Sequence, residues 1–216
     1  IDMASRNAIQ LGPFAEMMRF IFKNILMHIC LIFGLFGNIL TIITLADKRM
    51  RRSSPARYIL AITFLDTIYL ICTFVSNIEI MYSSLDLESV APFLSIISYP
   101  LSDFAGNAST YCIVMFTVER FLAVSHPLKS RIWCRPAQTR RVICWTVFVC
   151  FVCTFPTFLE NKIVFRWDDR ANKTIPILTD SDLLSFVKPY MYLYFWFIAT
   201  FFQFVPLTLL IIFNSI

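Results

Sequence analysis

Asn24–Ala46 of this chain reads NILMHICLIFGLFGNILTIITLA and contains no Asp, Glu, Lys or Arg. A helix needs about 20 consecutive apolar residues to cross the hydrocarbon core of a bilayer, and this segment is long enough. Val142–Leu159 and Pro189–Ile216 are also free of these four residue types. Apolar residues make up 58% of the chain, against roughly half in soluble domains. The sequence therefore predicts an integral membrane protein.

Two further apolar segments carry isolated charges and complete the set of predicted spans. Transmembrane helices are expected at about 24–46, 58–82, 93–124, 142–160 and 189–216. None of these segments alternates strictly between apolar and polar residues, as the strands of a porin-like barrel do. The predicted fold class is an all-α membrane protein with one membrane domain over residues 1–216, and both ends of the chain look cut.

Basic residues are concentrated in two of the predicted loops. They are Lys48, Arg49, Arg51, Arg52 and Arg57 after the first span, and Arg120, Lys129, Arg131, Arg135, Arg140 and Arg141 around the end of the third. Loops rich in Lys and Arg stay on the cytoplasmic side, so the amino terminus is expected outside. Such loops also account for the net charge of +5, so no nucleic-acid partner is expected.

The long loop at about Glu160–Lys188 is then extracellular. It contains Asn172-Lys173-Thr174, an N-glycosylation acceptor on the correct side of the membrane. The seven cysteines fall in predicted spans or, for Cys134, in a cytoplasmic loop. Because none lies in a predicted outer loop, we expect no disulfide.

Polar side chains inside the predicted spans are few, and each is costly in hydrocarbon. They are Asn38, Asp66, Asp103, Asn107 and Ser109. Ser109 precedes Arg120 by about 16 Å along a helix, which places it near mid-membrane, at the depth expected for Asp66. A carboxylate beside a hydroxyl suits a small cation or a proton. The alternative is a protonated Asp66 that bonds Asn38 and only holds helices together.

Glu119 and Arg120 form the inner end of the third predicted span. An arginine is always protonated, and one that is released from a carboxylate can accept a partner that enters the helix bundle. The alternative is an interfacial arginine that only extends its charged end into water. The residues alone leave both interpretations open.

Five landmarks, in order and at family-like intervals, resemble helices one to five of the rhodopsin-like G-protein-coupled receptors. They are Gly37-Asn38, Asp66, Glu119-Arg120-Phe121 with His126-Pro127-Leu128, Trp145, and Phe204-Val205-Pro206. The resemblance covers nearly the whole chain and implies a partial seven-helix receptor domain, multi-pass in the plasma membrane. The stretches around Glu119-Arg120 and His126–Arg131 resemble invertebrate FMRFamide-type neuropeptide receptors in particular.

The resemblance also implies roles for the buried and inner polar residues. Asp66 and Ser109 match the family's allosteric sodium site. Arg120 matches the arginine that engages the G protein, and Glu119 matches its resting partner.

Other positions match packing sites or depart from the family pattern. Trp145 and Pro206 match packing and helix-distorting positions. Ser95 stands where the family usually has a cysteine. The family's outer disulfide is therefore expected to be absent.

Two acidic residues are candidates for ligand binding if the ligand is an RFamide-type peptide. Its arginine would need a carboxylate partner, and Glu79 and Asp103 are placed to provide one. Amine receptors of the family carry an Asp where this chain has Ser102, so an amine ligand is less favoured. The alternative, in which Asp103 pairs with a neighbouring helix, stays open.

The resulting expectation is a receptor and not an enzyme. It would bind an extracellular FMRFamide-like neuropeptide, activate a heterotrimeric G protein from within the lipid membrane, and use no cofactor except an allosteric sodium ion. One alternative is a transporter or channel, although no internal repeat or glycine-interrupted half-helix supports it. Another is a truncated receptor that does not signal.

Overall fold

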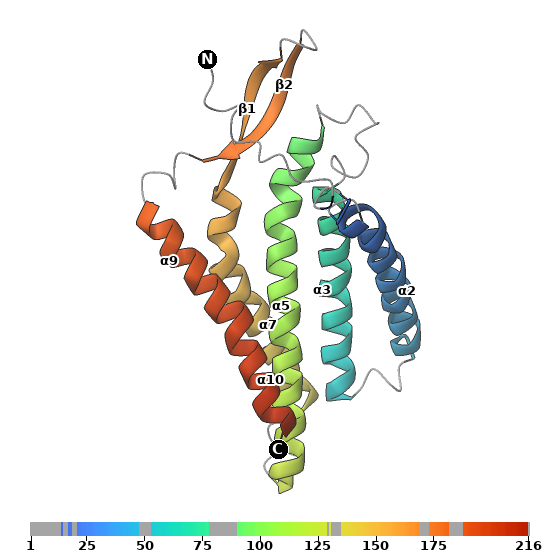
Figure 1. The fold of residues 1–216 in the computed structure, drawn as a ribbon. Coiled ribbons are helices and arrows are strands. Elements are labelled where there is room, and N and C mark those ends of the chain that lie inside the picture. Colours follow the sequence, from blue (N-terminus) through green and yellow to red (C-terminus); the bar gives the residue numbers. More distant parts are fainter. Residues whose placement is uncertain are drawn as a thin grey trace.

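The computed structural model describes residues 14, 17–18, 21–47, 53–77, 90–128, 130, 135–168, 173–181 and 188–215. Within these ranges, five helices are long and apolar enough to cross a membrane, so the predicted all-α membrane fold is confirmed. The helices are α2 (Met27–Leu45), α3 (Ser54–Ser76), α5 (Ala91–Ser125), α7 (Pro136–Thr154), and α9 (Lys188–Ala199) joined to α10 (Val205–Ser215). They form one elongated bundle with α5 near its centre (Figure 1).

Two helices extend beyond the starts of the predicted membrane spans at 58 and 142. α3 begins at Ser54 because the Ser53 hydroxyl caps it, accepting the backbone N–H of Ala56 at 3.4 Å, and a proline lies in the first turn. α7 begins at Pro136 and includes two arginines that the sequence prediction left outside the span. Charged residues mark where the apolar core of the bilayer ends, but a helix can continue past that depth.

The centre of the bundle is built around α5. Its buried residues Ala108, Tyr111 and Cys112 pack with Leu65 of α3 and with side chains of α7 and the fifth span. Small residues let helix backbones approach closely, and the resulting van der Waals packing is one of the interactions that associate helices in lipid. Most large apolar side chains of the outer helices are exposed, as expected for surfaces that face acyl chains.

The fifth span contains a π-helical segment, Thr200–Phe204, between α9 and α10. There the backbone N–H of Val205 bonds the carbonyl of Thr200, five residues back. The next donor in this pattern would be residue 206, but Pro206 has no N–H. The Tyr111 hydroxyl of α5 donates instead to the Phe201 carbonyl, at 2.5 Å.

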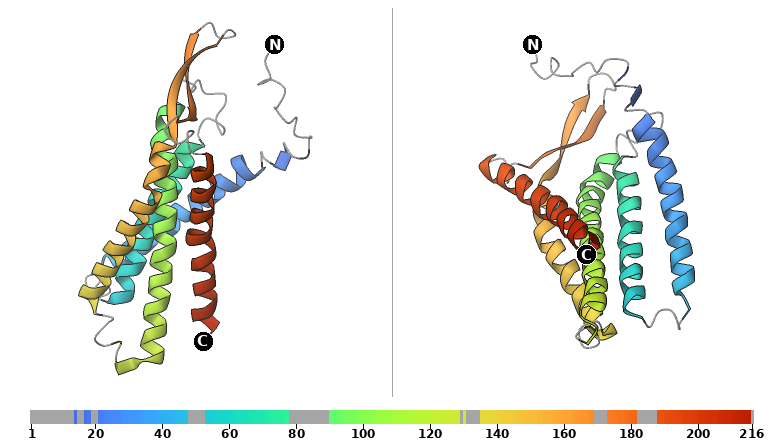
Figure 2. Two further views of the ribbon diagram at one scale, coloured as in Figure 1. Left: turned by 90° about the vertical axis from the view of Figure 1, so that its left-hand side faces the viewer. Right: turned by 60° about the horizontal axis from the view of Figure 1, so that its bottom comes forward.

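A β-hairpin lies beyond the outer end of the helices, where the sequence predicted only a long loop. β1 (Asn161–Asp168) pairs antiparallel with β2 (Lys173–Asp180). A 3₁₀ turn, Phe155–Leu159, leads into it from α7, and the Ser181 N–H donates to the Glu160 carbonyl at 2.7 Å across its base. Figure 2 shows the hairpin projecting past the end of the bundle at which α3 ends and α5 begins.

Candidate functional site

A buried polar contact joins α3 and α5 in the middle of the bundle. The Ser109 hydroxyl donates to the Asp66 carboxylate at 2.5 Å. Ser109 is buried and Asp66 is half-buried. The depth argument from the sequence predicted that these two residues meet, and the structure brings them into contact.

Asn38 does not bond Asp66, as the purely structural alternative required. Its side-chain amide donates to the Thr67 hydroxyl at 3.0 Å, and that hydroxyl donates to the Thr63 carbonyl at 2.7 Å. Successive residues on a helix point about 100° apart, so Thr67 faces α2 while Asp66 faces α5. Asn38 therefore ties α2 to α3 and leaves the Asp66–Ser109 pair separate.

The chemistry of this pair fits a hard monovalent cation better than a transition metal. A carboxylate and a hydroxyl supply oxygen ligands, which hard cations prefer. In the part of the chain that the structure describes, no group of three or more His, Cys, Asp or Glu side chains could hold a metal ion. Asp66 and Ser109 would thus provide two of the oxygens that a sodium ion needs.

Arg120 lies at the inner end of α5, beside a cavity of about 400 Å³. Its guanidinium lies 4.7 Å from the centre of the Phe116 ring, in a cation–π contact. The Phe121 and Phe213 rings, 5.1 Å apart, join α5 to α10 at the same level. The cavity is lined by Phe116, Thr117, Arg120, Phe121, Val124, Ser125, Phe213 and Asn214.

Glu119 points away from Arg120, toward α7 and α3. The Thr139 hydroxyl donates to its carboxylate at 3.3 Å, and Thr139 is also hydrogen-bonded to the Ser54 hydroxyl. The structure records no ion pair between Glu119 and Arg120, so the resting pair that the resemblance implied is not the arrangement found. Thr139 was missed because nothing in its sequence context signals a contact across three helices.

The inner ends of α3 and α7 are tied together next to this contact. Arg57 donates from its guanidinium to the Pro136 carbonyl at 2.8 Å. Pro136 opens α7, and Thr139 follows it by one turn. The inner end of α5 is therefore braced on the Glu119 side and open on the Arg120 side.

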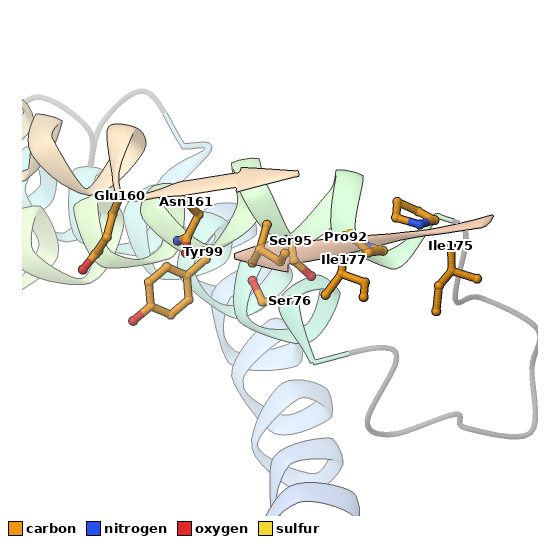
Figure 3. A pocket seen from close by; sticks show the side chains of 10 residues that line it. Ser76, Pro92, Ser95, Tyr99, Glu160, Asn161, Ile175 and Ile177 are labelled. Atoms are coloured by element: carbon orange, nitrogen blue, oxygen red, sulfur yellow. The ribbon is translucent and has the colours of Figure 1, made fainter. Parts of the chain in front are cut away.

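At the outer end, a cavity of about 630 Å³ lies between α3, α5 and the hairpin. Figure 3 shows Glu160 and Tyr99 close to each other at one part of its wall, and Ser95 beside Ser76 at another. The remaining lining residues are Pro92, Asn161, Ile175, Pro176, Ile177 and Leu178. β2 thus forms one wall, and Ser95, where the family usually has a cysteine, lies inside the cavity.

The structure describes only one of the two acidic residues that were predicted to bind the ligand. Asp103 is half-buried on α5, one turn further into the membrane than Tyr99, and is not among the residues that line the cavity. Glu79 and the acceptor Asn172 lie outside the described residues. The carboxylate that does line the cavity is Glu160, which sequence reasoning did not single out.

Comparison with known proteins places this arrangement in a family. The family described as "Serpentine type 7TM GPCR chemoreceptor Srw" matches residues 24–216. The chain belongs to this family. It is a multi-pass protein of the plasma membrane, and the family match favours a receptor over a transporter or channel.

Several curated proteins are similar to this receptor. An FMRFamide peptide receptor, frpr-18, from Caenorhabditis elegans is 30% identical over 61% of this chain and 31% of its own length. An FMRFamide receptor from Drosophila melanogaster is 32% identical over 63% of this chain and 26% of its own. The neuromedin U receptor homolog nmur-2 of C. elegans is 33% identical over 57% of this chain and 30% of its own length. The resemblance to FMRFamide-type receptors is confirmed, over less than a third of each relative's length.

Proposed function

We propose that this receptor binds an extracellular peptide in the outer cavity and activates a heterotrimeric G protein through Arg120. One observation carries the proposal: α5 supplies lining residues to both the outer cavity and the inner cavity. It supplies Ser95 and Tyr99 to the outer cavity and Arg120 to the inner one. A ligand outside and a protein inside can therefore act on the same helix.

The outer cavity suits a peptide because its walls are mixed in character. β2 supplies the apolar side chains of Ile175 and Ile177, while Glu160 and Tyr99 supply polar groups. A cationic group of the peptide would pair with the Glu160 carboxylate, because charge-assisted hydrogen bonds are stronger than neutral ones. The relatives named FMRFamide receptors support a peptide of that kind.

The mechanism is a shift between two states of the bundle. In the state described here, Glu119 is held by Thr139, and the Arg120 guanidinium lies over Phe116 beside the inner cavity. A G protein that enters this cavity would take Arg120 as its partner. Because ligand and G protein favour the same state of the bundle, each raises the affinity of the receptor for the other.

The Asp66–Ser109 pair supports an allosteric sodium site as part of this proposal. An ion there would supply a positive charge to the Asp66 carboxylate. The residues themselves connect α3 to α5 at mid-membrane, so a change at the pair affects the helix that carries Arg120.

The test is peptide-stimulated nucleotide exchange on membranes that contain the full receptor. Arg120→Ala should abolish or strongly reduce exchange while surface expression and basal peptide binding persist. Ser125→Ala, in the same cavity, is the matched control and should signal normally. Full stimulation by Arg120→Ala would contradict the coupling role. A wild-type receptor that binds peptide without stimulating exchange would support the non-signalling alternative.

The outer cavity has its own test. Glu160→Gln should weaken binding of a peptide with a basic residue about tenfold or more, since a hydrogen bond to a charged group contributes about 1.5–3 kcal/mol. A peptide whose basic residue is replaced by a neutral one should bind both receptors equally. Equal affinity of Glu160→Gln and wild type for the basic peptide would remove Glu160 from the site.

A further inference from the structure

The outward face of α7 differs from the other membrane-facing surfaces that the structure describes, because it combines arginines with aromatic rings. The opposite face of α7 carries the buried Thr139 and Cys150, which pack against the rest of the bundle. Arg140, Arg141 and Trp145 lie on the exposed face. Trp145 was expected to pack, but 65% of its surface is exposed.

This face is hollowed into a groove of about 620 Å³, which we call the α7 groove. It is lined by Ala137, Arg140, Arg141, Cys144, Trp145 and Phe148. The Trp145 and Phe148 rings meet edge to face with centres 5.8 Å apart, so the wall above the arginines is a fixed apolar surface. A second hollow of about 540 Å³ adjoins it and shares Arg141 and Trp145.

The two arginines lie at the cytoplasmic end of the groove, in the first turns of α7. Neither guanidinium has a hydrogen bond or ion pair within the part of the chain that the structure describes. A guanidinium carries five donors and matches phosphate in geometry. Arg140 and Arg141 therefore make the cytoplasmic end of the α7 groove positively charged and rich in hydrogen-bond donors, at the depth of the inner lipid headgroups.

We propose that the α7 groove binds an anionic phospholipid of the cytoplasmic leaflet. Its phosphate would lie at Arg140 and Arg141, and an acyl chain would lie along Trp145 and Phe148. Charge complementarity selects this occupant, because the cytoplasmic leaflet carries anionic lipids that attract Lys and Arg side chains near its surface. The proposal does not depend on peptide binding or on G-protein coupling.

A second copy of the chain fits the groove less well. In a two-fold symmetric dimer the same patch faces itself, so the arginines of one copy would approach those of the other. Like charges brought together in a low-dielectric setting repel strongly. A lipid phosphate supplies the opposite charge and also an acyl chain for the aromatic wall.

The experiment is quenching of Trp145 fluorescence by brominated lipids in vesicles that contain the full receptor. Vesicles of phosphatidylcholine receive a minor fraction of brominated phosphatidylserine or of brominated phosphatidylcholine. Trp145→Phe identifies the Trp145 contribution to the signal. We expect brominated phosphatidylserine to quench Trp145 at a severalfold lower lipid fraction, because each arginine near an anionic surface changes affinity roughly fivefold.

Variants distinguish a specific lipid-binding site from general attraction between basic residues and an anionic membrane. Arg140→Gln with Arg141→Gln should remove the preference for phosphatidylserine, while Arg51→Gln with Arg52→Gln, an equal change of charge in another basic loop, should retain it. Equal quenching by both lipids, or a preference that survives Arg140→Gln with Arg141→Gln, would overturn the proposal. A loss of the phosphatidylserine preference in the control variant would also overturn it. The same holds if lipid quenching is absent and Cys144 cross-links to Cys144 of a second copy.

Discussion

At the residue scale, the Asp66–Ser109 contact allows a test of the sodium hypothesis. Asp66→Asn removes the negative charge that would hold the ion, so the sodium dependence of agonist affinity should disappear. The measurement compares peptide affinity in sodium chloride and in choline chloride. Asn38→Ala is the control: it loses a bond to Thr67 rather than to Asp66, so its sodium response should be that of wild type. Unchanged sodium sensitivity in Asp66→Asn would leave this residue a structural hydrogen bonder.

Thr139 gives a second prediction at this scale, because its hydroxyl donates to Glu119 and its exposed surface is only 1%. Thr139→Val removes that donor, so the Glu119 carboxylate keeps one hydrogen bond fewer at α7 and an ion pair with the adjacent Arg120 becomes more favourable. Basal nucleotide exchange should then fall roughly fivefold, the equivalent of a hydrogen bond of about 1 kcal/mol. Thr139→Ser keeps the hydroxyl and should restore basal exchange.

Glu119→Gln tests the same contact from the other side. A neutral amide cannot form an ion pair with Arg120, so in a Glu119→Gln background Thr139→Val should no longer lower basal exchange in the absence of peptide. A rise in basal exchange in the single variant Thr139→Val would show instead that Thr139 helps to restrain Arg120.

At the scale of single elements, the π-helical segment of the fifth span depends on another helix. Tyr111→Phe leaves the Phe201 carbonyl without its donor inside the bundle. The loss should lower stability by about 0.6–1.7 kcal/mol, the range measured for hydrogen bonds between membrane helices. Pro206→Ala restores a backbone N–H at the position that the π pattern requires.

The double variant separates this effect from simple loss of packing. In a Pro206→Ala background, Tyr111→Phe should lower the stability of the receptor much less than it does alone. A double-mutant cycle of thermal unfolding in detergent would measure this coupling. Additive costs would show that the tyrosine hydroxyl does not substitute for the missing proline N–H.

The elements differ in how far the sequence could predict them. Asn24–Ala46 predicted α2 because an uncharged apolar run of that length is typical of a helix that crosses a bilayer. α7 begins before the predicted span at 142–160, because Arg140 and Arg141 mark where the apolar segment ends, whereas the helix continues past that depth. The hairpin was missed, although Ile163-Val164-Phe165 is rich in strand-forming residues, because the segment was interpreted only as a loop between spans.

The candidate site was predictable where depth alone decides a contact. Asp66 and Ser109 could be paired by counting residues from Arg120, and they do meet. The Thr139–Glu119 contact and the position of Glu160 could not be predicted, because both depend on how the hairpin and α7 rotate against α5. Rotation about a helix axis changes partners without changing depth.

At the scale of the whole molecule, the basic loops set the orientation of the bundle. A tag inserted before Ile25 should be accessible to antibody on intact cells, and a tag within Asp47–Arg57 should be accessible only after permeabilisation. The reason is that Lys- and Arg-rich loops are retained in the cytoplasm. The opposite labelling pattern would exchange the two cavities and remove the basis for both proposals.

The hairpin has a consequence for how long a ligand stays bound. It contacts α5 through the Phe93 and Phe165 rings, 6.5 Å apart, and Glu160–Ser181 contains no cysteine that could tie it covalently to the bundle. If β1 and β2 move away from α5 together, a peptide lying against β2 would leave at the rate of that motion. Related complexes differ mainly in dissociation rate. Phe165→Ala should therefore shorten the residence time of the peptide severalfold and leave its association rate nearly unchanged, as surface plasmon resonance would show.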